Sequence, residues 1–216
     1  MTENNFEEFE SEYDDINPNQ LVYSIWVKPK RTLKYILEKC PTKYVILFLI
    51  LGGIARAISR ASERGMGDTM STASVLIMAI LTGGLIGWIA YFIYAWALSF
   101  TGKWLNGKSD PETFRTIIAW SLVPTIASII LLIPELIIIG DQLFKSEFLY
   151  LSTFQSVALI GFGLIELALW IWSLVILVIG IKIIQGFGTG KAILNMLLPA
   201  LVLFLPLLLI FMLFSL

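Results

Sequence analysis

The sequence predicts an all-α integral membrane protein: a bundle of five transmembrane helices preceded by a short N-terminal interfacial helix. First, five long apolar runs occupy most of the 216 residues, and four of them meet or exceed the roughly 20 residues that a helix needs to cross a bilayer. Second, 57% of the residues are hydrophobic and 14% are charged, against about 25% charged in soluble domains. Because the hydrocarbon core contains no water, such runs form helices, whose backbone hydrogen bonds close internally.

Three regions are expected along the chain. Residues 1–24 are acidic and have the composition of a disordered cytoplasmic tail. Residues 25–43 form a basic amphipathic interfacial segment, and residues 44–216 form the membrane domain. Its spans are expected near residues 44–62, 73–101, 112–140, 153–182 and 191–216.

The interfacial segment contains a predicted helix between Pro29 and Pro41. Leu33, Ile36 and Leu37 recur there at helical spacing. We expect this apolar stripe and the surrounding basic residues to bind the inner surface of the membrane and its anionic headgroups. The alternative is a basic stop before the first span. The expected lipid-binding residues are Lys28, Lys30, Arg31, Lys34 and Lys39.

The second span carries Ala79, Gly83 and Gly87 at four-residue intervals. Small residues at this spacing let two helix backbones approach closely, which favours association of helices in lipid. We expect these residues to pack inside the bundle, and a dimer interface is the alternative.

The third span begins with a helix-start signal and is interrupted by prolines. Ser109 and Glu112 have the spacing of a capping box, and Pro111 suits the first turn. Pro124 and Pro134 lie further along this span, and the fifth span also contains two prolines. Interior prolines leave backbone carbonyls that neighbouring helices must cover.

Arg56, Glu135 and Glu166 are charged residues of the spans, where charge is costly and faces a partner or a cavity. At 1.5 Å per residue, Arg56 lies ~20 Å and Glu166 ~24 Å from the inner face. We therefore predict an ion pair between Arg56 and Glu166. Glu135 falls at the outer boundary, where we expect it to reach water or Arg60. The alternative is a polar transport site formed by Glu135 and Glu166, although the spans contain few other polar residues to line a path.

The basic residues predict the orientation, because Lys and Arg near span ends favour the cytoplasm. With the N-terminus inside, eleven basic residues lie on the cytoplasmic side and four on the other. We expect a cytoplasmic N-terminus and an outer C-terminus in a bacterial inner membrane. The eleven are Lys28, Lys30, Arg31, Lys34, Lys39, Lys43, Lys103, Lys108, Arg115, Lys182 and Lys191, and the four are Arg56, Arg60, Arg64 and Lys145.

No motif for soluble catalysis is visible. The chain has no histidine, which removes the commonest general base and zinc ligand. It also lacks a GxxxxGK[ST] loop and a GxGxxG that opens a helix after a strand. The single cysteine, Cys40, excludes an internal disulfide. We therefore predict a protein that is not an enzyme, with no cofactor, no metal site and no nucleic-acid partner.

Three short motifs carry a resemblance to a known family. They are Trp26-Val27-Lys28-Pro29-Lys30-Arg31-Thr32-Leu33, then Phe114-Arg115-Thr116 leading to Ala119-Trp120-Ser121-Leu122-Val123-Pro124, then Gln185-Gly186-Phe187-Gly188 followed by Lys191-Ala192-Ile193. In this order, from about Ile25 to the C-terminus, they resemble the Yip family of Ypt/Rab-interacting membrane proteins, and in particular its bacterial branch.

The resemblance implies a five-helix domain with a cytoplasmic N-terminus. Eukaryotic relatives are adaptors in vesicle traffic that bind prenylated small GTPases and one another. The DLYGP-type signature of those relatives is absent here, which argues against GTPase binding. We therefore expect a non-enzymatic protein that organises membrane lipids, other membrane proteins or copies of itself. The alternative is a small transporter, channel or lipid-translocating protein that uses Glu135, Glu166 and the proline-broken helices.

Overall fold

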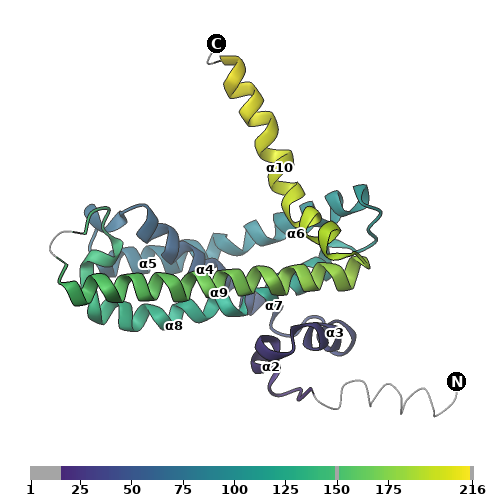
Figure 1. The fold of residues 1–216 in the computed structure, drawn as a ribbon, viewed down its shortest axis with the longest axis horizontal. Helices are drawn as coiled ribbons and strands as arrows, with labels where there is room; N and C mark the ends of the chain where they lie inside the picture. Colours follow the sequence, from purple (N-terminus) through teal and green to yellow (C-terminus); the bar gives the residue numbers. More distant parts are fainter. Residues whose placement is uncertain (1–15, 149–150, 215–216) are drawn as a thin grey trace, which may run out of the picture. The chain divides into compact units, whose positions relative to one another are not determined.

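The computed structural model describes residues 16–148 and 151–214, with the backbone alone for residues 203–214. Every regular element in these ranges is helical (Figure 1). Four helical stretches are long and apolar enough to span a membrane, Val45–Glu63, Thr72–Trp104, Pro111–Ile138 and Thr153–Gln185, and a shorter apolar stretch covers Thr189–Val202. The chain is therefore a multi-span helical membrane protein, and the count of five spans stays a prediction.

The helices follow one another in a simple order, with two interruptions inside spans. A π-helical turn, η2, separates α5 from α6, and the third stretch divides into α7 and α8 at Leu122. The elements are α2 (Leu21–Val27), α3 (Pro29–Lys39), α4 (Val45–Glu63), η1 (Met66–Asp68), α5 (Thr72–Thr82), η2 (Gly83–Gly87), α6 (Trp88–Trp104), α7 (Pro111–Ser121), α8 (Val123–Ile138), η3 (Gly140–Phe144), α9 (Thr153–Gln185) and α10 (Thr189–Phe214).

The chain forms two compact units. Unit 1 comprises Met1–Lys43, Phe92–Ile117 and Ile176–Leu216, and unit 2 comprises Tyr44–Tyr91 and Ile118–Val175. The division falls inside α6, α7 and α9. The sequence analysis contains no such division, because apolar periodicity is continuous through these helices.

Unit 2 is built around α4, which packs against α5, η2 and α8. Small residues allow the closest of these approaches. A Cβ atom on Gly53 would lie 2.5 Å from the carbonyl oxygen of Gly83, and one on Gly87 would lie 2.8 Å from the Cα of Gly53. Ala79, one turn before Gly83, is also buried. The small residues of the second span thus lie against α4 in the same chain.

An apolar cluster packs at the C-terminal end of α4 in unit 2. Ala61, Val75, Ile139, Leu143 and Phe144 are buried together there. The hydroxyl of Ser62 donates a hydrogen bond of 2.6 Å to the backbone carbonyl of Leu143. These contacts fix η3 against α4 and form one end of the candidate site described below.

In unit 1, the apolar stripe of α3 is covered by protein. Leu33 and Ile36 are 0% exposed, and the hydroxyl of Thr116 on α7 donates a hydrogen bond to the carbonyl of Pro41 directly after α3. The expectation that this stripe is buried in lipid is therefore wrong for Leu33 and Ile36. Packing inside unit 1 satisfies the same hydrophobic periodicity, which is why the pattern alone does not distinguish the two environments.

The start of α7 also corrects a detail of the sequence analysis. Asp110, rather than Ser109, caps the helix, because its carboxylate accepts a hydrogen bond of 2.8 Å from the backbone N–H of Thr113. The hydroxyl of Ser109 instead donates to the backbone carbonyl of Ile184 on α9. Further along the span, Pro124 lies in the first turn of α8, whereas Pro134 lies inside that helix without ending it.

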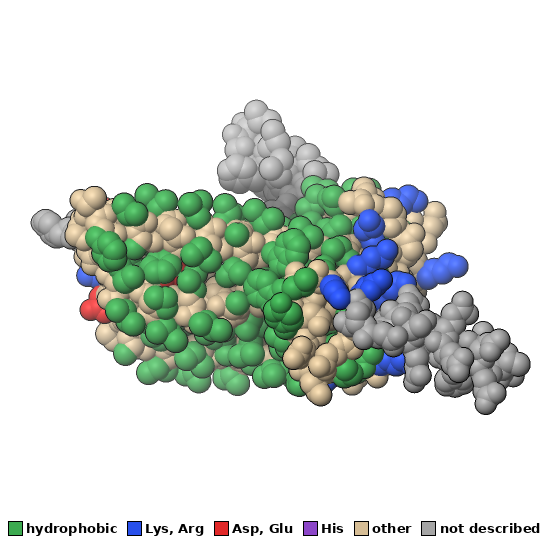
Figure 2. All heavy atoms as spheres, turned by 60° about the horizontal axis from the view of Figure 1, so that its bottom comes forward, with side chains coloured by type: hydrophobic (Ala, Val, Ile, Leu, Met, Phe, Trp, Pro, Cys, Tyr) green, Lys and Arg blue, Asp and Glu red, His purple; other side chains and the backbone are tan. Residues whose placement is uncertain are grey.

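Large apolar side chains cover much of the surface. Examples are Leu85, Ile137 and Phe154, each more than two-thirds exposed. Figure 2 shows hydrophobic side chains over the visible face, with Lys and Arg side chains gathered in one area. In water such a surface would be unusual, so it is the surface that faces lipid.

Candidate functional site

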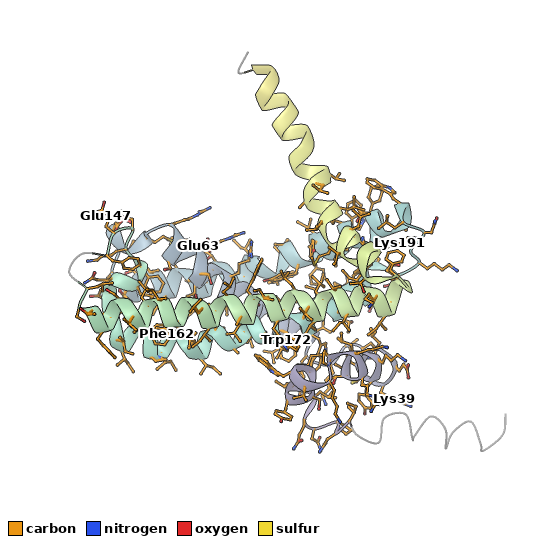
Figure 3. All side chains as sticks on the ribbon, viewed as in Figure 1. Lys39, Glu63, Glu147, Phe162, Trp172 and Lys191 are labelled. Carbon is orange, nitrogen blue, oxygen red and sulfur yellow. The ribbon has the colours of Figure 1, made fainter. Side chains whose placement is uncertain are left out.

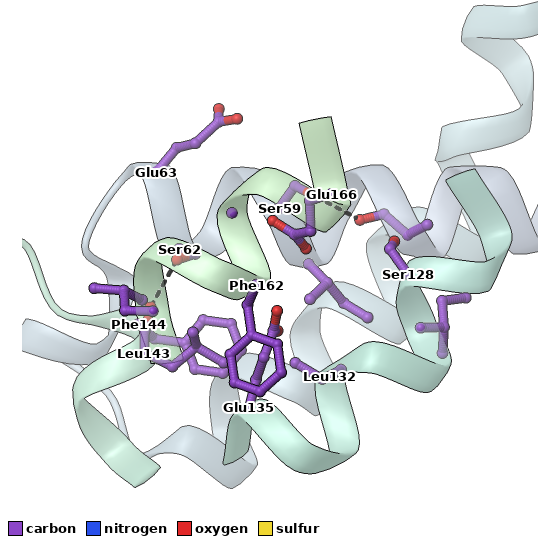
Figure 4. A pocket seen from close by; sticks show the side chains of 15 residues that line it. Ser59, Ser62, Glu63, Ser128, Leu132, Glu135, Leu143, Phe144, Phe162 and Glu166 are labelled. Atoms are coloured by element: carbon purple, nitrogen blue, oxygen red, sulfur yellow. Dashed lines mark hydrogen bonds between the residues drawn. The ribbon is translucent and has the colours of Figure 1, made fainter. Parts of the chain in front are cut away.

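Unit 2 contains a pocket of about 220 Å³ that combines acidic and apolar side chains. It is formed by α4, α8, η3 and α9 (Figure 4). Its polar lining consists of three carboxyl groups and three hydroxyl groups, from Glu63, Glu135, Glu166, Ser59, Ser62 and Ser128. The remaining lining residues are Ala55, Ile58, Ile129, Leu132, Leu143, Phe144, Leu159, Phe162 and Gly163.

Two of the carboxyl groups lie deep in this pocket. Glu135 on α8 is 5% exposed, and Glu166 on α9 is half-buried. Figure 4 shows both side chains pointing into the pocket, from different helices. Glu63, the last residue of α4, is exposed at the edge. The structure therefore brings together the two residues that the sequence analysis names as a possible polar site.

The surroundings of Glu135 differ from the sequence expectation. Its position along the helix predicts an outer-boundary location in contact with water or Arg60. Instead Glu135 is buried, and Arg60 is exposed and does not line the pocket. Burial contradicts contact with open water, because depth along one helix does not include the coverage that α9 and η3 provide; the outer-boundary position stays a prediction.

Arg56 is exposed on α4 and does not line the pocket. Its pairing with Glu166 stays a prediction. The charge swap tests it: the pairing predicts that Arg56→Glu relieves the folding defect of Glu166→Arg, whereas an additive defect in the double variant contradicts it.

Each of the three hydroxyl groups in the pocket donates a hydrogen bond to a backbone carbonyl. Ser59 donates to the carbonyl of Ala55 at 3.2 Å, Ser62 to that of Leu143 at 2.6 Å, and Ser128 to that of Thr125 at 2.7 Å. Each hydroxyl proton is therefore used, and only oxygen lone pairs remain for the pocket. Isolated serines in apolar runs give no signal in the sequence, so only the structure identifies these three as pocket residues.

Unit 1 contains a different polar centre, whose amide side chains bond to neighbouring segments but leave Asn195 Oδ1 and Gln185 Nε2 without a hydrogen-bond partner among the described residues. The side-chain amide of Asn195 on α10 donates to the carbonyl of Leu98 at 3.0 Å and to the hydroxyl of Thr101 at 3.1 Å. The side-chain carbonyl of Gln185 on α9 accepts from the backbone N–H groups of Lys108 and Ser109. A Cβ atom on Gly102 would collide with the side-chain amide of Gln185. This centre joins α6, α9 and α10.

Among the described residues outside the spans, Asp68, Asp110 and Cys40 have shifted pKa values. Hydrogen bonds from Ser146 lower the pKa of Asp68, and the backbone hydrogen bond from Thr113 lowers the pKa of Asp110. Burial raises the pKa of the Cys40 thiol, and the charge of Lys43 opposes this shift. Because thiolate rather than thiol is the nucleophile, Cys40 is a poor candidate for reactive chemistry.

The basic residues of the N-terminal segment surround the outer side of α3. Lys30, Arg31 and Lys39 are exposed there, and Figure 3 shows Lys39 at the end of the helix.

Across residues 16–148 and 151–214, no group of three or more His, Cys, Asp or Glu residues could hold a metal ion.

Comparison with protein-family models assigns most of the chain to a family. The family model of the Yip1 domain matches residues 23–211, which is most of the chain. Neither a curated protein nor a solved structure matches.

Proposed function

Because this chain belongs to the Yip1 domain family, we propose that it is a non-enzymatic scaffold of a bacterial inner membrane. In this proposal the helical domain lies in the bilayer, and the basic N-terminal segment recruits anionic lipid to the cytoplasmic face. Partner membrane proteins or further copies of the chain then assemble on that lipid.

The distribution of basic residues carries the proposal. Eleven of the fifteen Lys and Arg residues belong to unit 1, and six of these eleven lie between Lys28 and Lys43. A basic residue near an anionic surface contributes about 1 kcal/mol of attraction. With the apolar stripe of α3 buried in protein, electrostatic attraction is what remains to bind lipid headgroups.

Lipid selectivity in reconstituted membranes tests this proposal. The full chain is placed in bilayers that contain spin-labelled phosphatidylserine or phosphatidylcholine, and the fraction of motionally restricted lipid is measured by electron spin resonance. We expect restriction of phosphatidylserine in excess of phosphatidylcholine, and we expect salt to reduce the excess because it screens exposed charges.

Two variants locate the effect. Lys30 and Lys39 are exposed on α3, so the double variant Lys30→Gln/Lys39→Gln should lose much of the phosphatidylserine excess. Arg64→Gln removes an exposed charge from unit 2 and serves as the matched control. Equal restriction of both lipids by the unchanged chain would contradict the proposal.

Transport is the second candidate, and one observation favours it: Glu135 and Glu166 share a pocket. The family match gives this candidate no support. Purified protein in liposomes, assayed for proton, ion and lipid movement, separates the two functions. Flux that disappears in Glu166→Gln would replace the scaffold proposal, whereas the scaffold proposal predicts no flux.

A further inference from the structure

With its carboxyl groups ionised, the polar lining of the unit 2 pocket consists only of hydrogen-bond acceptors. The protons of Ser59, Ser62 and Ser128 are donated to backbone carbonyls, and ionised carboxylates are acceptors alone. No lysine, arginine or amide side chain lines the pocket. A molecule that complements this lining must bring hydrogen-bond donors.

Glu135 gives the strongest indication that a ligand is involved. Its side chain is 95% buried, since 5% is exposed, and it points into the pocket (Figure 4). None of the side-chain hydrogen bonds of the described residues involves its carboxyl group, and its oxygens are not among the sealed polar atoms that lack a partner, so they stay accessible from the pocket. A buried carboxylate without a partner is costly, and a bound cation would remove this cost.

The pocket also has room for an organic group. A cavity of about 150 Å³ binds benzene in an engineered protein, and this one is about 220 Å³. Leu132, Leu159 and Phe162 provide apolar walls beside the carboxyl groups. Phe162 and Phe144 also offer aromatic rings, which attract cations over their faces.

A hard metal ion fits this lining poorly. Calcium takes six to eight oxygen ligands, and within the described ranges no set of three acidic, histidine or cysteine side chains is arranged to hold a metal. A primary ammonium group needs fewer partners, because it has three N–H donors. Two carboxylates and one serine oxygen would satisfy it, while its hydrocarbon contacts the apolar walls.

We propose that the unit 2 pocket binds a small organic cation, a primary ammonium group that carries a short hydrocarbon. Its N–H groups are held by Glu135 and Glu166, and its hydrocarbon lies against Leu132, Leu159 and Phe162. This binding site goes beyond the proposed scaffold function and does not depend on it. It also requires no transport.

Isothermal titration calorimetry on the full chain in detergent micelles tests the proposal. The probe is cyclohexylammonium, and cyclohexanol is the neutral control of nearly the same size and shape. Titration into empty micelles subtracts partition into detergent. The proposal predicts saturable binding of the amine at one site per chain and no saturable binding of the alcohol.

Glutamine substitutions test whether Glu135 and Glu166 each bind the amine. Glu135→Gln and Glu166→Gln each remove one charged acceptor while keeping the size of the side chain. Each is expected to weaken amine binding about tenfold to a hundredfold, the loss associated with a hydrogen bond to a charged group. Glu147→Gln, in the loop after η3 (Figure 3), lies outside the pocket and should leave binding unchanged.

A second pair of variants keeps the test independent of the acidic residues. Gly163 lines the pocket, and an added Cβ atom there meets no atom within 4 Å. Gly161, on the same helix, has equally open space but does not line the pocket. Gly163→Leu should fill the pocket and abolish binding in a folded protein, whereas Gly161→Leu should bind the amine normally.

The outcomes separate clearly. Saturable amine binding that is lost in Gly163→Leu and weakened in both glutamine variants supports the site. Absence of saturable amine binding by the folded unchanged chain overturns it, as does equal binding of cyclohexanol. Amine binding that is unchanged in both glutamine variants also overturns it, whatever the lipid selectivity or flux of the protein.

Discussion

Unit 1 and unit 2 treat polar groups inside a membrane protein in opposite ways. In unit 1, Asn195 and Gln185 are hydrogen-bonded to neighbouring segments, and charge is carried mainly by exposed basic side chains. In unit 2, Glu135 and Glu166 face a pocket whose three serine hydroxyls already donate to backbone carbonyls. The buried amides of unit 1 therefore join helices, although Asn195 Oδ1 and Gln185 Nε2 have no hydrogen-bond partner in the described part of the chain, whereas the two carboxyl groups of unit 2 line a pocket.

The charge balance of the units follows the same division. The described part of unit 1 has eleven basic and three acidic residues, whereas unit 2 has four basic and six acidic residues. The six acids of unit 2 are Glu63, Asp68, Glu135, Asp141, Glu147 and Glu166. The comparison suggests that one unit is suited to anionic surfaces and the other to cations.

The largest expected effect comes from the packing that shapes unit 2. In Gly83→Ala the new Cβ atom would lie 2.6 Å from the carbonyl oxygen of Gly53 and from the Cα of Ile54. Because backbone atoms must move apart, we expect a loss of about 1–3 kcal/mol, typical of overpacking. Equilibrium unfolding in sodium dodecyl sulfate measures this loss.

Gly84→Ala is the control for this variant, since its Cβ atom would lie 3.7 Å from the nearest atom, the Cδ1 of Ile54. We expect it to be neutral or slightly stabilising, because alanine is the better helix former. Equal stability of the two variants would show that α4 and η2 are less closely packed than described.

A smaller effect distinguishes the polar groups of the two units. Asn195→Leu removes the two hydrogen bonds of the Asn195 amide to α6 and should cost about 1 kcal/mol, the typical value between membrane helices. Glu135→Gln removes a buried carboxyl that has no such partner, so it should keep or raise the stability. Thermal unfolding of both variants compares them.

If Glu135→Gln destabilises the protein as much as Asn195→Leu does, the carboxyl group is structural and the contrast between the units fails. Thr101→Val offers an internal check for unit 1. In a double-mutant cycle, the loss of stability in the double variant should be smaller than the sum of the losses in Thr101→Val and Asn195→Leu, because the two residues share a hydrogen bond.

The smallest expected effects are those of two hydrogen-bonded carboxylates under acid, the helix cap Asp110 and the loop residue Asp68, which accepts from Ser146. Asp110 and Asp68 have pKa values below the ordinary 3.8. A carboxyl with a lowered folded-state pKa contributes stability that is present above its unfolded pKa and lost as the pH falls through its folded pKa. Stability should therefore decline as the pH falls below about 4, and acid unfolding monitored by circular dichroism follows this decline.

Asp110→Asn separates the charge of the cap from its geometry. Asparagine is as good an N-cap as aspartate, whereas alanine costs about 1 kcal/mol. We expect Asp110→Asn to keep most of the stability at neutral pH and to reduce its acid dependence. An unchanged acid dependence would mean that Asp110 does not contribute to it.

The sequence predicts the helical membrane class because length and apolar composition alone decide it. It also predicts an interruption near Pro124, and α7 and α8 divide at Leu122. Pro134 gives the same signal, yet α8 continues through it. A proline indicates a missing backbone hydrogen bond, and whether the helix divides there depends on neighbours that the sequence does not identify.

The candidate site is only partly predictable. Glu135 and Glu166 attract attention because carboxyl groups are rare in hydrocarbon, but their common pocket depends on how α8 and α9 pack. Ser59 and Ser62 look like ordinary small residues of a span, and only their bonds to carbonyls reveal an all-acceptor lining. The stripe of α3 shows the same limit, since protein covers it where lipid was expected.

The contrast between basic and acidic units has a direct test in membrane topology. In a Cys40→Ser background, Lys108→Cys marks the loop between α6 and α7 in unit 1, and Glu147→Cys marks the loop between η3 and α9 in unit 2. Sealed right-side-out vesicles are treated with a membrane-impermeant thiol reagent. The account predicts labelling at position 147 from outside and at position 108 only after permeabilisation; labelling of both positions from the same side would contradict it.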